Sequence, residues 1–253
     1  MNTEYYENYS DELRRVMPMK LYGHAGRPIL FIPCQDGRFY DFENFGLSDD
    51  FAPFIESGKC MVFAIDTMDK ESWSDTAGDP YHRIRRHEQW INYITREAVP
   101  FIRMITNQKN GWDGYPGIIT FGCSLGATHA VNLWFRFPEL FDGCLALSGV
   151  YEASFFLGDY SDEVVYRNSV NDYLAGMSPD HPYIERYNRN RAIICVGQGA
   201  WEQVGSTQYL KQRCGELGIG SVWVDLWGYD VNHDWPWWHK QVAYFLPKLL
   251  GLE

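Results

Sequence analysis

The clearest chemical signal in the sequence is the run GCSLG at 122–126, which matches the pattern G-x-S-x-G. In this pattern a strand turns abruptly into a helix, and the turn holds a serine hydroxyl exposed at the end of the strand. The two glycines let the strand and the helix approach each other without a steric clash. An apolar run at 117–121 precedes the motif and a helical pattern follows it. We therefore predict that Ser124 is a nucleophile, with Cys123 as the neighbouring alternative.

A serine hydroxyl is a weak nucleophile, so a base must lie beside it. In enzymes that hold serine on such a turn, the acid and then the histidine follow it along the chain. Of the histidines after Ser124, His129 falls in the next helix, His181 in a turn, and His239 along the last predicted helix. His233 lies in the loop between the last predicted strand and that helix. This position favours His233 as the general base.

The third group should be a carboxylate that orients the imidazole and stabilises its charged form. The loop GQGAWEQ follows the apolar run at 192–197 and contains Glu202, which we favour for this role. Asp225, Asp230 and Asp234 are alternatives. Asp225 lies within a predicted strand, whereas Asp230 and Asp234 are close to His233 in sequence.

Acyl transfer also needs two backbone N–H groups that stabilise the oxyanion. Leu125, directly after the nucleophile, is expected to supply one of them. The other should come from the loop after the apolar run at 28–34, and from its residues we choose Gln35.

The elements that must position these residues alternate between buried strands and helices. Short, continuous apolar runs read as strands buried on both faces. They lie at 28–34, 60–66, 117–123, 144–149, 192–197 and 221–227, and the partly alternating segment 12–23 reads as a half-buried strand. Helical patterns cover 81–106, 127–137, 204–217 and 236–250, and Pro100 should kink or divide the first.

This alternation predicts an α/β fold with a mainly parallel sheet and helices on both faces. Residues 150–190 depart from the pattern and read as short helices and loops. A loop-rich excursion at this point would lie over the strand ends, where ligands bind in such sheets. We interpret residues 1–253 as a single domain.

Composition excludes several classes of partner. The formal net charge is −11, so nucleic acid and anionic membrane surfaces should be repelled. No apolar window is long enough for a transmembrane helix, and the first residues show no secretory signal, so we expect a cytoplasmic protein. The six scattered cysteines read as buried free thiols, without the spacing of a zinc site. We expect neither a metal nor a cofactor, and a homo-oligomer is compatible with the sequence.

Four segments together resemble the putative esterase family, which is related to esterase D and the mycolyltransferases. They read GCSLGA, FPELFDGCLALSG, VGQGAWE and NHDWPWWHKQVAYFL, and the resemblance extends over nearly the whole chain. It implies an α/β-hydrolase fold without a large separate lid domain, and the assignment of Ser124, Glu202 and His233 as the triad. It does not imply a particular ester.

The chain is also rich in aromatic residues, which make up 17% of it. Most should serve packing, but those on loops at the strand ends could line a pocket for an apolar or aromatic acyl group. The residues considered for this role are Phe39, Tyr40, Trp73, Phe155, Phe156, Trp201 and Trp235.

From these observations we predict a serine carboxylic ester hydrolase that acts on a small-molecule ester through an acyl-enzyme. Two alternatives stay open. The same triad could transfer the acyl group to a second alcohol, or the fold could serve as a binding protein without catalysis.

Overall fold

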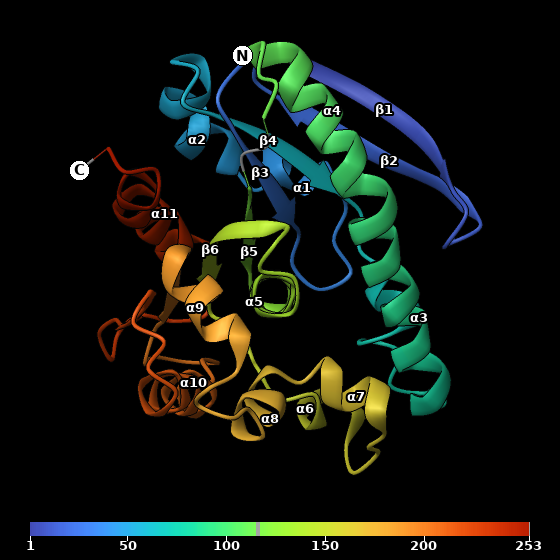
Figure 1. Cartoon of the computed structure of the whole chain (residues 1–253), viewed down its shortest axis with the longest axis vertical. Helices are drawn as coiled ribbons and strands as arrows, with labels where there is room; N and C mark the ends of the chain where they lie inside the picture. Colours follow the sequence, from blue (N-terminus) through green and yellow to red (C-terminus); the bar gives the residue numbers. More distant parts are fainter. Residues whose placement is uncertain (115–116, 253) are drawn as a thin grey trace.

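The computed structural model describes residues 1–114 and 117–252 of the chain. Its centre is an eight-stranded sheet in the order β1-β2-β4-β3-β5-β6-β7-β8. The long strands β1 and β2 lie side by side at one edge of it (Figure 1). Strands β3 to β8 run parallel to one another, whereas β1 pairs antiparallel with β2, and β2 antiparallel with β4. The strands are β1 (Thr3–Ser10), β2 (Arg15–Tyr22), β3 (Arg27–Ile32), β4 (Cys60–Ile65), β5 (Ile118–Cys123), β6 (Phe141–Leu147), β7 (Arg191–Val196) and β8 (Val222–Leu226).

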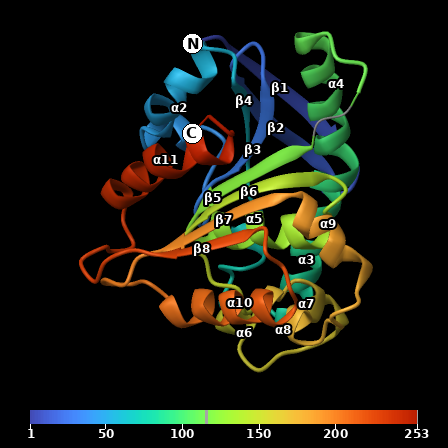
Figure 2. The same ribbon diagram turned by 60° about the vertical axis from the view of Figure 1, so that its left-hand side comes forward.

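Helices cover both faces of the sheet, as predicted (Figure 2). Consecutive residues of β3 show this directly, because Ile29 packs on one face and Leu30 on the other. Side chains of a strand alternate between faces, so a strand covered on both sides reads as one apolar run. One face carries α1 (Asp41–Asn44), α2 (Leu47–Glu56) and α11 (Trp235–Leu249), and the other carries α3 (Pro80–Tyr93), α4 (Val99–Asn110), α5 (Leu125–Arg136) and α10 (Val204–Glu216).

The sequence analysis missed one strand, β1. Its residues TEYYENYS are mostly exposed, because β1 forms the edge of the sheet and pairs only with β2 within the described residues. An edge strand with little apolar burial leaves no apolar run to detect.

Pro100 divides the long helix, as predicted. The chain forms α3, then a π-helical turn at Ile94–Ala98 (η2), and then α4, in which Pro100 is the second residue. Proline has no N–H to donate, so it is tolerated where a new helical segment begins.

The segment at 150–190 consists of four short helices, not a separate lid domain. They are α6 (Ser154–Leu157), α7 (Glu163–Arg167), α8 (Val170–Ala175) and α9 (Pro182–Arg189). Leu157 and Val165 share a small apolar cluster with Leu125 and Trp73, so the segment packs directly beside the GCSLG turn. Within the described residues, no helix has both the length and the apolar character needed to cross a membrane.

A buried histidine of α3 packs against α5. His87 is 1% exposed, and its ring stacks on His129 with centroids 5.0 Å apart. Burial lowers the pKa of His87 well below its ordinary value, and the positive charges nearby, Arg136 among them, lower it further. In the folded protein the His87 imidazole is therefore neutral at pH values where the same imidazole is protonated in the unfolded chain.

This difference predicts a pH dependence of stability. Below about pH 6.5 the unfolded chain takes up a proton at His87 that the folded chain does not. The free energy of unfolding should therefore fall as the pH falls. His87→Phe should remove up to about 1 kcal/mol of that fall between pH 6.5 and 5.5, measured by chemical denaturation. An unchanged pH slope in this variant would contradict the assignment.

Candidate active site

The turn between β5 and α5 has the strained geometry that the motif predicts. Ser124 has φ +56° and ψ −127°, a conformation that non-glycine residues rarely adopt. A Cβ on Gly122 would lie 2.4 Å from the carbonyl of Gly126, and a Cβ on Gly126 would lie 2.3 Å from the carbonyl oxygen of Ile32. Only glycine fits at either position, so α5 can begin directly against β3.

The structure brings His233 to Ser124 across 109 residues of sequence. The imidazole Nε2 lies 2.9 Å from the Ser124 Oγ, which is hydrogen-bond distance. His233 lies in the loop between β8 and α11, and its backbone N–H donates to the carbonyl of Ala200 at 3.0 Å. Its side chain is 24% exposed, so the pair is reachable from solvent.

Glu202 lies on the other side of the imidazole. Its Oε2 is 3.3 Å from the His233 Nδ1, and its side chain is 1% exposed. Its Oε1 accepts hydrogen bonds from the Ser148 hydroxyl at 2.7 Å and from the Gly197 N–H at 3.1 Å. A buried carboxylate with its other oxygen occupied in this way is held in one orientation.

The three alternative acids have other surroundings. Asp234 caps α11 by accepting from the Trp235 N–H at 2.7 Å. Asp225 lies within β8, where it pairs in register with Cys195, and Asp230 is exposed in the following loop. The carboxylate that contacts His233 is that of Glu202.

Ser148 is a component of the site that the sequence analysis missed. It follows β6 with φ +61°, accepts a hydrogen bond from Trp238 Nε1 at 2.9 Å, and donates its own to Glu202. The edge of the Trp238 ring also packs on His233, with centroids 5.0 Å apart. The sequence did offer a signal for Ser148, because it lies at the carboxyl end of the strand next to β5, and neighbouring parallel strands end together at that edge.

The two predicted oxyanion donors lie on segments that touch. Leu125 is the first residue of α5, and Gln35 lies in the loop after β3. Gly126 packs on the backbone of Pro33, so that loop leaves the sheet beside the first turn of α5. The Gly37 N–H donates to the Cys34 carbonyl at 2.9 Å, which closes a tight turn around Gln35. Neither amide has a tested role, and both stay predictions.

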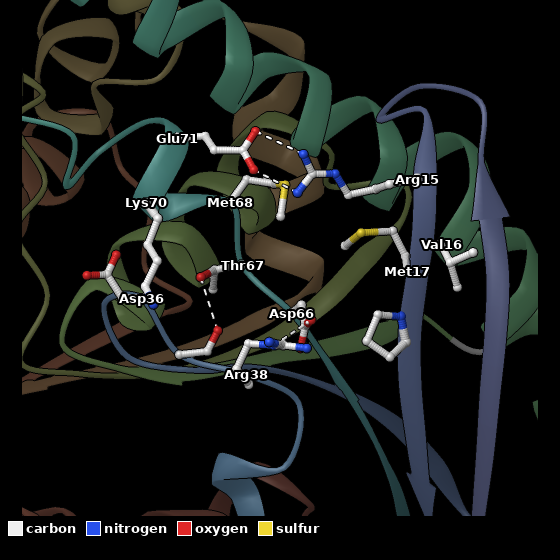
Figure 3. Close-up of a pocket in the computed structure, with 12 residues that line it drawn as sticks. Arg15, Val16, Met17, Asp36, Arg38, Asp66, Thr67, Met68, Lys70 and Glu71 are labelled. Carbon is white, nitrogen blue, oxygen red and sulfur yellow. Dashed lines mark hydrogen bonds and ion pairs between the residues drawn. The ribbon is translucent and has the colours of Figure 1, made fainter. Parts of the chain in front are cut away.

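The far end of this loop is fixed by Asp66, at the end of β4 (Figure 3). Its carboxylate accepts from the Phe39 N–H at 2.8 Å and from the Arg38 Nε at 2.7 Å. The Thr67 hydroxyl donates to the Gly37 carbonyl at 3.3 Å. A cavity of about 270 Å³ opens here between β2, β4 and the loop, whereas Ser124 lies beyond β3 at the end of β5.

The cysteine beside the nucleophile has a protonated thiol. Cys123 is fully buried, and burial raises its pKa well above the ordinary value. Cys34, in the loop after β3, has a pKa raised to about 12, also by burial. A protonated thiol is a poor nucleophile, so this chemistry favours Ser124 over Cys123.

The aromatic residues considered for substrate contact differ in exposure. Trp201 is 86% exposed and Phe155 58%, whereas Trp73 is 3% exposed and packs on Phe156. Tyr40 is exposed, Phe39 and Phe156 are partly buried, and Trp235 stacks on Phe45. Contact of these residues with a substrate stays a prediction.

The glycine contacts predict a matched pair of stability effects. Gly126→Ala should lower the free energy of unfolding by more than about 2 kcal/mol, because the added carbon collides with the β3 backbone. Gly215→Ala should change it by less than about 1 kcal/mol, and toward greater stability, since nothing lies within 4 Å of an added Cβ in that helix. Urea denaturation of both variants checks this, and equal effects would contradict the close approach of α5 to β3.

Residues 10–249 match the model of the family described as putative esterase. A search of curated proteins found no match. Among solved structures, a ferulic acid esterase aligns over 100% of this chain and 99% of its own, with TM-score 0.74 and 14% identity.

Two further structures share the fold at similar identity. MPT51 of Mycobacterium tuberculosis aligns over 99% of this chain and 98% of its own, with TM-score 0.69 and 13% identity. An S-formylglutathione hydrolase from Agrobacterium tumefaciens aligns over 99% and 93%, with TM-score 0.65 and 14% identity. The chain therefore belongs to the putative esterase family, and it is an esterase with the α/β-hydrolase fold.

Proposed function

We propose that this esterase cleaves small-molecule carboxylic esters through an acyl-enzyme formed on Ser124. The observation that carries the proposal is the contact of Ser124, His233 and Glu202, which come from three separate loops. In this arrangement the histidine contacts the serine with one nitrogen and the carboxylate with the other, which is the geometry that activates a hydroxyl for acyl transfer.

The proposed first step is attack on the ester carbonyl. The Ser124 Oγ forms a bond to the carbonyl carbon as its proton passes to the His233 Nε2. Glu202 accepts the hydrogen bond from Nδ1 and stabilises the imidazolium, which then protonates the departing alcohol. Water, deprotonated by the same imidazole, hydrolyses the acyl-enzyme and restores Ser124.

The backbone N–H groups of Leu125 and Gln35 are the proposed donors to the oxyanion. Such donors accelerate the reaction because they bind the charge that develops in the transition state more strongly than the neutral carbonyl. Leu125 is suited to this role because it follows the nucleophile at the N-terminus of α5, where N–H groups lack helical partners.

Aromatic side chains around the site are proposed to contact the acyl group. Trp201 directly precedes Glu202, and its side chain is 86% exposed. Phe155 and Phe156 lie on α6, in the segment that packs beside Leu125. Phe39 and Tyr40, at the end of the loop of Gln35, complete the proposed surface. Trp73 is buried against Phe156, so its proposed part is to support that ring.

The nucleophile is tested by a pair of adjacent substitutions. Ser124→Ala should lower kcat for nitrophenyl esters by about a thousandfold or more and abolish labelling by a fluorophosphonate probe. Cys123→Ala should stay active and be labelled, because its buried thiol takes no part. A Ser124→Ala enzyme that keeps more than about a tenth of the wild-type kcat would refute the proposal.

The acid is tested by a second matched pair. Glu202→Gln removes the charge that supports the imidazolium, so kcat should fall by roughly a hundredfold or more. Asp234→Asn should stay near the wild-type rate, since asparagine also caps a helix. Steady-state kinetics of the two purified variants decide the assignment, and a reversed order would make Asp234 the acid.

A further inference from the structure

A second buried pair of titratable side chains, Asp69 and His129, lies on the opposite side of Ser124 from Glu202. Asp69 begins a short 3-10 turn after β4 (η1, Asp69–Glu71), and His129 lies in α5, five residues after the nucleophile. The Asp69 Oδ1 is 2.9 Å from the His129 Nε2, and the two side chains are 2% and 1% exposed. Removing such groups from water costs several kcal/mol each, so good partner geometry must offset it.

The second oxygen of Asp69 contacts the loop after β3. The Asp36 N–H donates to the Asp69 Oδ2 at 3.3 Å, and Asp36 has φ +60°. Asp36 directly follows Gln35, the residue whose amide is the proposed second oxyanion donor. One carboxylate therefore joins the loop of Gln35 to the helix that starts with Leu125.

The side chain of Asp36 is also held in place, by a hydrogen bond from Ser74. Its Oδ1 accepts a hydrogen bond from the Ser74 hydroxyl, and the Ser74 N–H donates to the Asp69 carbonyl at 2.9 Å. The segment from Asp69 to Ser74 thus contacts both the backbone N–H and the carboxylate of Asp36.

His129 is enclosed from the other side by rings. Trp90 and His87 lie with centroids 5.0 Å from it, and Trp73 lies at 6.0 Å. The Trp90 Nε1 donates to the Asp66 carbonyl at 2.9 Å, which ties this packing back to the end of β4. The imidazole has little freedom to move, so it gives Asp69 a fixed partner.

We propose that the Asp69–His129 pair positions the oxyanion hole by setting the distance between the Leu125 amide and the loop amide at Gln35. This inference rests on the proposed function. Asp69 and His129 are positioning residues, because both act through the backbone and touch no substrate. Displaced donors weaken binding of the oxyanion more than binding of the neutral ester, so the effect should appear in kcat and leave KM nearly unchanged.

The test compares Asp69→Asn, His129→Leu and His129→Gln. In Asp69→Asn, one oxygen can still accept a hydrogen bond, but the amide NH2 faces either the Asp36 N–H or the His129 ring as a second donor. In His129→Leu, the Asp69 carboxylate loses its imidazole partner. Asp69→Asn and His129→Leu should each lower kcat for a nitrophenyl ester by about ten- to a hundredfold, with KM within about threefold of wild type. The rate constant of fluorophosphonate inactivation should fall in parallel, since the phosphoryl oxygen occupies the same hole. Glutamine can donate from nearly the position of Nε2, so His129→Gln should restore kcat to within about threefold.

Tyr187→Phe is the matched control, because it removes another buried hydrogen bond to the same helix. The Tyr187 hydroxyl donates to the Phe135 carbonyl at 2.7 Å, at the end of α5 far from Ser124. This variant should lower Tm yet keep the wild-type kcat. The inference is overturned if Asp69→Asn lowers Tm alone, if Tyr187→Phe lowers kcat equally, or if His129→Gln is as slow as His129→Leu.

Failure of this inference can be told apart from failure of the proposed function. If Ser124→Ala remains active, or if wild-type enzyme that hydrolyses the ester is not labelled by the fluorophosphonate probe, the triad itself is wrong and the inference falls with it. If wild-type activity depends on Ser124 and Asp69→Asn keeps the wild-type kcat, the inference alone is refuted.

Discussion

The contact between α5 and the end of β3 is the constraint on which the rest of the site depends. Gly126 brings the first turn of the helix against the backbone of Ile32 and Pro33, closer than any side chain would allow. Ser124 must then leave β5 in a strained conformation, and its hydroxyl lies within hydrogen-bond distance of His233. The same approach sets the Leu125 amide beside the loop of Gln35.

Two buried carboxylates flank this turn. Glu202 follows β7 and orients His233 with the help of Ser148 and Trp238, while Asp69 follows β4 and joins α5 to the loop after β3. All these groups lie at the carboxyl edge of the parallel strands, where the loops of neighbouring strands meet. Each carboxylate has partners at both of its oxygens, so each is held in one orientation.

Much of the fold could be read from local patterns because burial leaves a local signature. Six continuous apolar runs each became a strand of the parallel sheet, and Pro100 marked the division between α3 and α4. β1 was missed because an edge strand buries too little apolar surface to produce such a pattern. The turn at Ser124 was predictable because its strain requires glycines two residues away on either side.

The sequence by itself determined two of the groups that meet, the serine of the GCSLG turn and a histidine in the loop before the last helix, and it offered several acids as the third. Only the tertiary structure decided which of several acids contacts His233, and only the tertiary structure revealed that Ser148 hydrogen-bonds to that acid. It also gave His129, which reads locally as an ordinary helix residue, a buried partner 60 residues earlier in the chain. Contacts of this kind depend on the order of strands in the sheet and on which loops that order brings together. No periodicity within a single element encodes them.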